Sequence, residues 1–144
     1  MARSSDRGVG TVNDRETSMS QHSDKANVKN VLFYACSGGA NVAEVADRAA
    51  REMMFAQAGR MFCLAGLGAG IEEMVQTARD ADLNIVIDGC PMDCAKLIFD
   101  GCGVENYVQL KVTDLGVEKS KDVRATDEQV AGMVAAIKTV LAEA

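Results

Sequence analysis

The sequence predicts an α/β fold with three layers, in which helices cover both faces of a four-stranded, mostly parallel sheet. Short apolar runs alternate along the chain with longer amphipathic segments, in the order β-α-β-α-β-α-β-α. This alternation is typical of a parallel sheet, because parallel neighbours need a crossover connection that usually contains a helix. Right-handed crossovers leave few topologies, and we expect the strand order 2-1-3-4, with the switch point between strands 1 and 3.

Four apolar runs are expected to form the strands. The first three are short and are followed by turn residues, whereas the fourth alternates between apolar and polar residues, as a half-buried strand does. The predicted strands cover residues 31–35, 60–64, 85–87 and 107–112.

Amphipathic segments predict the first two helices. Between Val42 and Met53, apolar residues recur with helical spacing, and charged residues lie off the apolar stripe. A glycine-rich turn is expected over residues 65–70. A second helix follows it, with Ile71 and Ala78 on its apolar face.

Two further helices complete the pattern. Pro91 is expected in the first turn of the third helix, where its missing N–H breaks no hydrogen bond, and Gly101 is expected at its end. Thr126 and Gln129 have the spacing of a capping box at the start of the last helix. The apolar face of that helix is predicted to hold Val130, Met133, Val134, Ile137 and Leu141.

A single domain is expected over residues 28–144, preceded by a disordered tail over residues 1–27. The tail holds four basic and four acidic residues, and its apolar residues are too few to offset the entropy lost on ordering. His22, the only histidine of the chain, lies in this tail, so solvation is expected rather than ligand binding. Met19 offers an alternative start of the chain.

The composition argues against several classes of function. A net charge of −6 and a pI of about 4.7 disfavour binding to phosphate backbones, and an aromatic content of 4% disfavours stacking on single-stranded nucleic acid. No apolar run of ~18 residues is available for a transmembrane helix, and no signal peptide is visible. Five cysteines, an odd number, favour a reducing cytoplasm, where clustered cysteines more often serve metal or thiol chemistry than disulfides. We expect a cytoplasmic protein that binds neither nucleic acid nor membrane, with partners that the sequence leaves unknown.

The cysteines form the strongest candidate site. Cys36, Cys63 and Cys90 each lie at the carboxyl end of a predicted strand, with 26 residues between successive members. Because parallel strands end at the same edge of a sheet, with neighbours ~4.8 Å apart, the three sulfurs can converge. Cys94 is expected one helical turn after Cys90 and can supply a fourth. Four thiolates at ~2.3 Å form a closed tetrahedral zinc site. Nearby helix N-termini are expected to lower the pKa of the thiols.

Alternatives to zinc remain open for these cysteines. Four thiolates hold an iron–sulfur cluster equally well, and single free cysteines are often small buried hydrophobes. Cys102 breaks the regular spacing and is expected to be a bystander or a local structural thiol.

Polar residues beside the cysteines extend the candidate site. Asp88 lies near a helix N-terminus, so we expect it to cap that helix or to support a metal ligand. Ser37 belongs to a glycine turn that can present N–H groups to an anion, although tight turning also explains the glycines. Asp114 and Lys119 lie in a polar loop over residues 113–121. That loop follows the last strand and is expected at the same edge of the sheet.

The motif Asp88-Gly89-Cys90-Pro91-x-x-Cys94-Ala95 resembles the DGC-domain family of zinc-binding proteins, as do Cys36-Ser37-Gly38 upstream and the run from Thr113 to Lys119 downstream. The resemblance covers about residues 29–143. The family resemblance implies no reaction, and Cys102 has no counterpart in the family. The zinc ligands that it implies are Cys36, Cys63, Cys90 and Cys94.

A thiol-based enzyme is the alternative function. The segment from Val31 to Val42 resembles the opening of low-molecular-weight tyrosine phosphatases and arsenate reductases, with a strand, a cysteine, a glycine turn and a helix. The phosphate-binding loop of those enzymes ends in an arginine, and this chain has none between Cys36 and Asp47. Redox or sulfur-transfer chemistry by Cys90 and Cys94 is the milder variant, although their Cys-x3-Cys spacing is not that of thioredoxins. A thiol-based enzyme of either kind would use Cys36 or Cys90.

Overall fold

The computed structural model describes residues 29–144 and confirms the expected α/β fold. Its sheet has four strands in the order β2-β1-β3-β4, and every neighbouring pair is parallel. The strands are β1 (Val31–Ala35), β2 (Arg60–Met61), β3 (Leu83–Asp88) and β4 (Tyr107–Lys111). The tail predicted over residues 1–27, with Met19 and His22, lies outside the described residues.

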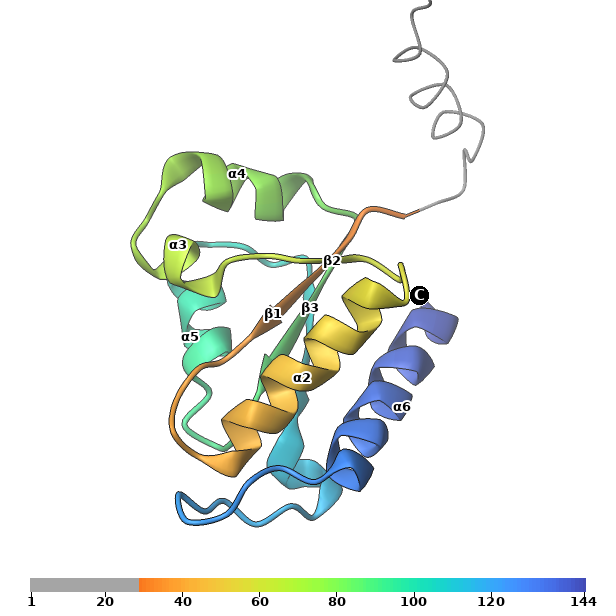
Figure 1. Ribbon diagram of the computed structural model, residues 1–144. Coiled ribbons are helices and arrows are strands. Elements are labelled where there is room, and N and C mark those ends of the chain that lie inside the picture. Colours follow the sequence, from red (N-terminus) through yellow and green to blue (C-terminus); the bar gives the residue numbers. More distant parts are fainter. Residues whose placement is uncertain (1–28) are drawn as a thin grey trace, which may run out of the picture.

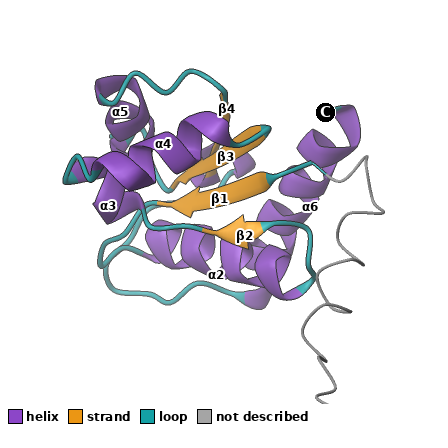
Figure 2. Cartoon of the chain, turned by 90° about the horizontal axis from the view of Figure 1, so that it is seen from above, coloured by secondary structure: helices purple, strands orange, loops and turns teal. Residues whose placement is uncertain are grey.

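Helices cover both faces of this sheet, which gives the three expected layers (Figures 1 and 2). One face carries α2 (Asn41–Phe55) and α6 (Asp127–Glu143), which lie side by side. The other face carries α3 (Leu64–Gly68), α4 (Glu72–Asp80) and α5 (Cys94–Gly101). None of the helices in the described part of the chain is long and apolar enough to cross a membrane.

The central strands are buried on both faces because helices cover both. Successive side chains of a strand point to opposite faces. On β1, Phe33 therefore packs with α2 and α6, whereas Leu32 and Tyr34 pack with the helices of the other face. Burying a side chain such as Phe33 or Leu32 stabilises the fold by roughly 1.5–3 kcal/mol. Because β1 buries side chains in both core layers, packing holds this strand, and the residues that follow it, in place.

The second strand begins where it was predicted but is shorter than expected, and the prediction of the following turn was wrong. Only Arg60–Met61 pair with β1, and the chain then leaves the sheet. The expected glycine-rich turn is instead the short helix α3. Gly66 allows this packing, because a Cβ atom there would lie 1.9 Å from Sδ of Met74. Tertiary packing thus overrides the weak helix propensity of glycine in this segment.

The prediction that Pro91 opens the third helix was also wrong. Pro91 lies in a turn, Asp93 has the left-handed φ of +56°, and α5 begins at Cys94. Cys90 therefore lies in the turn before the helix, and not one helical turn from Cys94 as expected. The physical reason is the capping carboxylate of Asp88, which accepts the N–H groups of the first helical turn.

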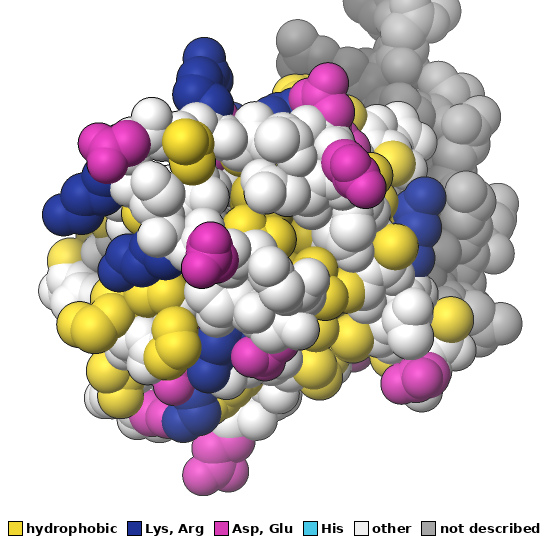
Figure 3. All heavy atoms as spheres, turned by 90° about the horizontal axis from the view of Figure 1, so that it is seen from below, with side chains coloured by type: hydrophobic (Ala, Val, Ile, Leu, Met, Phe, Trp, Pro, Cys, Tyr) yellow, Lys and Arg dark blue, Asp and Glu magenta, His cyan; other side chains and the backbone are white. Residues whose placement is uncertain are grey.

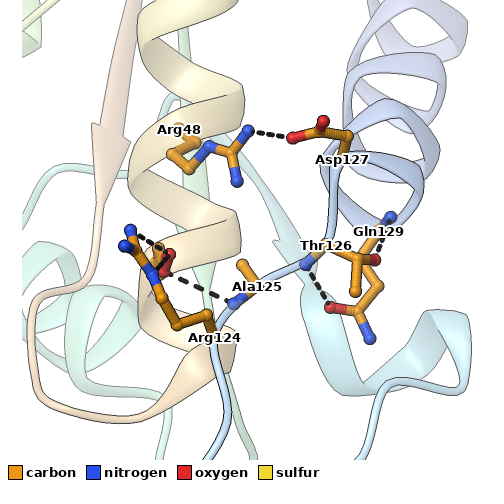
Figure 4. A network of polar contacts seen from close by, with 7 residues as sticks. Arg48, Arg124, Ala125, Thr126, Asp127 and Gln129 are labelled. Atoms are coloured by element: carbon orange, nitrogen blue, oxygen red, sulfur yellow. Dashed lines mark hydrogen bonds and ion pairs between the residues drawn. The ribbon is translucent and has the colours of Figure 1, made fainter.

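The start of α6 agrees with the sequence prediction. Oγ1 of Thr126 accepts the N–H of Gln129 at 3.1 Å, and Oε1 of Gln129 accepts the N–H of Thr126 at 3.0 Å (Figure 4). This capping box lies beside an ion pair of 2.6 Å between Arg48 of α2 and Asp127 of α6. The predicted apolar face of α6 is likewise confirmed, because its five residues belong to the core or pack against it. These contacts hold the start of α6 against α2, near the edge of the sheet at which the strands end.

Candidate thiol site

Three of the predicted cysteines line one cavity of about 320 Å³ at the carboxyl ends of β1 and β3. They are Cys36, Cys90 and Cys94. We call this cavity the thiol pocket; its other walls come from the turn after β1, the start of α2 and two lysines, Lys119 and Lys121. Figure 3 views the molecule from this end, where hydrophobic side chains, cysteines included, lie among basic and acidic groups.

Cys36 is anchored to β3 through both its backbone and its sulfur. Its N–H donates to the carbonyl oxygen of Ile87 at 3.0 Å, and its Sγ accepts the N–H of Gly89 at 3.1 Å. Burial raises the pKa of Cys36 to about 11; the Gly89 hydrogen bond opposes this, and the nearby charge of Asp88 adds to it. The expectation of a lowered pKa was therefore wrong for Cys36, because loss of hydration outweighs the N–H donor.

Gly89 brings the two cysteine segments together. A Cβ atom at this position would lie 3.0 Å from the carbonyl carbon of Val42 and 3.1 Å from the backbone nitrogen of Ala43. Both contacts are with the first turn of α2, whose backbone cannot turn away as a side chain could. The lack of a side chain at Gly89 thus lets the turn after β3 approach α2 closely, and that approach brings Cys90 next to Cys36.

Cys90 has a charged neighbour. Nζ of Lys119 lies 3.4 Å from Sγ of Cys90. Lys119 comes from the loop that follows the 3-10 helix η1 (Val112–Leu115), so this loop reaches the edge at which the strands end, as expected. The contact puts a positively charged group beside the sulfur of Cys90.

Asn41 holds this loop in place. The side chain of Asn41 is 4% exposed; its Nδ2 donates to the carbonyl oxygen of Glu118 at 2.9 Å, and its Oδ1 accepts the N–H of Ser120 at 2.7 Å. Sequence reasoning missed this residue, because its partners lie 77 and 79 positions away and asparagine after a glycine turn is unremarkable. Asn41 therefore fixes the two residues that flank Lys119.

Asp88 caps the helix that carries Cys94. Its carboxylate is 1% exposed and accepts the N–H groups of Ala95 at 2.8 Å and Lys96 at 3.1 Å. It also accepts Nε2 of Gln109 at 2.9 Å. Of the two roles expected for Asp88, the helix cap is confirmed, and the cap positions Cys94 at the first residue of α5.

Asp93 is held in its left-handed conformation by two neighbours from β4. Nε2 of Gln109 donates to its Oδ1 at 2.8 Å, and Nζ of Lys111 lies 3.0 Å from the same oxygen. The hydrogen bond from Lys111 holds the pKa of Asp93 below its ordinary value. Gln109 and Lys111 gave no signal in the sequence beyond the alternation of a strand, because their role depends on the sheet order.

The remaining predicted residues fall into two groups. Ser37 lines the thiol pocket, whereas Asp114 is exposed in η1 and does not. Cys63 is exposed at the N-cap of α3 and does not line the pocket. Cys102 does not line the pocket and donates its S–H to the carbonyl oxygen of Leu67 at 3.2 Å.

The thiol donors fit zinc in chemical type, since zinc readily takes thiolate ligands. A backbone N–H and an ammonium group face the sulfurs of Cys36 and Cys90 and offset negative charge there. Within residues 29–144, no three His, Cys, Asp or Glu side chains lie close enough together, as they stand, to hold a metal ion. The four-cysteine zinc site therefore stays a prediction.

Comparison with known proteins places the chain in a family. Residues 32–137 match the DGC domain, a range that includes all the cysteines of the chain. The chain is 33% identical over 100 residues to "Anaerobic and virulence modulator AnvM" of Pseudomonas aeruginosa, across 68% of this chain and 76% of that protein. No solved structure matches. The expected resemblance is thereby confirmed, and the chain belongs to the DGC-domain family.

Proposed function

We propose that this protein binds one zinc ion through cysteine thiolates at the edge of the sheet where the strands end. The ligands are Cys36, Cys90 and Cys94, with Cys63 as the fourth. The observation that carries the proposal is that three cysteines, from the ends of β1 and β3 and the start of α5, line one cavity. Three such thiols on one cavity are unusual, whereas a single buried thiol needs no special explanation.

The position of Cys63 supports its inclusion. β2 pairs in parallel with β1, with Leu32 opposite Arg60 and Phe33 opposite Met61. Phe62, the residue after β2, still donates its N–H to the carbonyl oxygen of Phe33 at 2.9 Å, so Cys63 comes directly after the last contact with β1. Cys63 is exposed and free, so its side chain can turn without breaking a core contact. Zinc binding would then order the loop between β2 and α3.

Charge balance also supports a thiolate site. Four thiolates and one Zn²⁺ carry a formal charge of −2, and such a charge needs donors and cations nearby. The N–H of Gly89, together with Lys119 and Lys121, provides them at the thiol pocket. An iron–sulfur cluster would use the same ligands and is the alternative cofactor.

A closed site of this kind leaves no ligand position for an activated water. We therefore infer a structural, carrier or sensor role for the metal. The name of the relative describes a modulator, which agrees with such a role better than with catalysis. Five free cysteines keep their reduced form in a reducing compartment, so we propose a cytoplasmic location.

Elemental analysis of protein purified anaerobically without chelators tests the proposal. We expect one zinc per chain in the wild type and loss of zinc and of thermal stability on Ser substitution at Cys36, Cys63, Cys90 or Cys94. Cys102→Ser is the matched control and should keep its zinc. Unchanged zinc content in all four variants, or no metal in the wild type, contradicts the proposal. Bound iron with acid-labile sulfide, in brown protein, identifies the cluster instead.

A thiol-based enzyme is the second candidate function. The contact of 3.4 Å between Lys119 and Cys90 favours it, because a neighbouring ammonium group stabilises a nucleophilic thiolate. In metal-free protein, Cys90 would then react with iodoacetamide faster than Cys36, whose pKa is raised to about 11. Equal labelling of the two cysteines at pH 7 contradicts this candidate.

A further inference from the structure

Tyr34 carries a buried hydroxyl group that lacks a partner. Its side chain is 0% exposed, and Oη has no hydrogen-bond partner among the described residues. A buried hydroxyl without a partner destabilises a fold, and natural proteins contain few of them. Phenylalanine would fill the same space at no such cost. The hydroxyl of Tyr34 therefore needs an explanation outside the packing of the core.

The surroundings of Tyr34 point to Cys63. The Tyr34 ring packs edge-on against Phe62, the residue before Cys63, with ring centroids 6.1 Å apart. Phe62 is itself fixed to β1, because its N–H donates to the carbonyl oxygen of Phe33 at 2.9 Å. The phenolic hydroxyl of a tyrosine can donate a hydrogen bond as well as accept one.

Tyr34 also stands next to the predicted ligand set along the chain. It precedes Cys36 by two residues on the same edge of the sheet, and Cys36 packs against the same core layer. Tyr34 is thus close along the chain to Cys36, and its ring packs against the residue that precedes Cys63.

We propose that Tyr34 is a positioning residue for the metal site: its hydroxyl donates a hydrogen bond to Sγ of Cys63 when Cys63 turns inward as a zinc ligand. The inference rests on the proposed function. Thiolate sulfurs bound to a metal keep partial negative charge and accept such bonds, and a partner of this kind orients its ligand. The bond would give the unpartnered hydroxyl its partner and fix the orientation of the Cys63 side chain.

Tyr34→Phe separates this role from simple packing. In the zinc-loaded protein, we expect the variant to bind zinc about 10- to 100-fold more weakly in competition with a chromophoric chelator. In the metal-free protein, the variant should unfold at a temperature equal to that of the wild type or about 2–5 °C higher, because the unpaired hydroxyl is gone. A merely structural tyrosine would not shift these two quantities in opposite directions.

Tyr107→Phe is the matched control, since Tyr107 is the other tyrosine of the chain and its hydroxyl donates to Oδ1 of Asp100 at 2.6 Å. It should leave the zinc affinity unchanged. In a Cys63→Ser background, Tyr34→Phe should cause no further loss of affinity, because the two changes remove the same bond.

The outcomes distinguish this inference from the proposed function. If the wild type binds zinc and Tyr34→Phe binds it with equal affinity, the proposed role of Tyr34 is wrong, whereas the proposed zinc site is unaffected. A metal-free variant that unfolds at a lower temperature overturns the role as well, because the hydroxyl then already has a stabilising contact. If the wild type binds no zinc, both the zinc site and the role of Tyr34 are wrong. The zinc content of the wild type is therefore measured before the variants are compared.

Discussion

Asn41 and Ser120 are hydrogen-bonded in both directions. The N–H of Asn41 donates to the carbonyl oxygen of Ser120 at 2.8 Å, and the N–H of Ser120 donates to Oδ1 of Asn41 at 2.7 Å. These bonds join the start of α2 to the loop after η1. Because Lys119 immediately precedes Ser120, the pair determines where the Lys119 ammonium group lies relative to Cys90.

Asn41→Ala should therefore loosen this loop. The variant loses two side-chain hydrogen bonds in a nearly buried position, so we expect it to be destabilised by about 1–3 kcal/mol in urea unfolding. Hydrogen exchange of the amides in residues 117–121 should accelerate. Ser120→Ala is the control, because both bonds to Asn41 use the backbone of Ser120. Equal exchange rates in Asn41→Ala and the wild type would falsify the role of Asn41.

Asp88→Asn should weaken the start of α5. The amide keeps one acceptor oxygen but loses the negative charge that faces the N–H groups of Ala95 and Lys96, so a loss of about 1–3 kcal/mol is expected. Cys94 should then be alkylated faster, as measured by mass spectrometry of its peptide. Asp100→Asn is the matched control, since Asp100 is an exposed carboxylate of the same helix whose partners are the side chains of Lys96 and Tyr107 and not the N–H groups of the first helical turn. A smaller loss of stability for Asp88→Asn than for Asp100→Asn would show that the cap is unimportant.

Gly89→Ala should displace the turn that carries Cys90. The added methyl group meets the backbone of α2 at 3.0 Å, and relieving that contact is expected to cost about 1–3 kcal/mol. Gly39→Ala is the control, because a Cβ atom there meets nothing within 4 Å. Thermal unfolding of the two variants measures the difference. If both variants unfold at the wild-type temperature, the turn that carries Cys90 does not pack tightly against α2.

The raised pKa of Cys36 predicts a pH dependence of stability in the metal-free protein. The folded state holds the Cys36 proton with a pKa of about 11, whereas the thiol has its ordinary value of 9.0 when exposed. The unfolded chain therefore binds fewer protons than the folded one between these values, so this contribution to stability is complete below pH 9 and is lost as the pH rises to about 11.

Denaturant unfolding of the metal-free protein at pH 8, 9, 10 and 11 measures this effect. Cys36→Ser should show a flatter decline than the wild type over this range, because serine does not titrate there. Identical slopes for the two proteins would mean that Cys36 is not desolvated in the folded state.

The sequence predicted the sheet well because its signals are local. Apolar runs with alternating amphipathic segments specify strands and helices, and the rule of right-handed crossovers then leaves few strand orders. The capping box of Thr126 and Gln129 was predictable for the same reason, since both partners lie within one turn. The element boundaries that failed were those decided by contacts between different elements, namely Gly66 of α3 against Met74 of α4 and Asp88 of β3 against Ala95 of α5.

The candidate site was predictable only in part. The regular spacing of Cys36, Cys63 and Cys90 indicates one edge of the sheet, because βα units of equal length return the chain to that edge. The spacing does not indicate which side chains point into a common cavity, and Cys63 does not line the thiol pocket. It also gives no warning that burial raises the pKa of Cys36, since desolvation depends on what packs around a sulfur.

The sequence by itself thus determined the α/β class, the strand order and the edge at which the cysteines meet, because periodicity, chain direction and handedness act along the backbone. Only the tertiary structure decided that Asn41 holds Lys119 over Cys90 and that Asp88 caps the helix of Cys94. These hydrogen bonds join residues from separate segments of the chain, so they form only when the helices pack on both faces of the sheet.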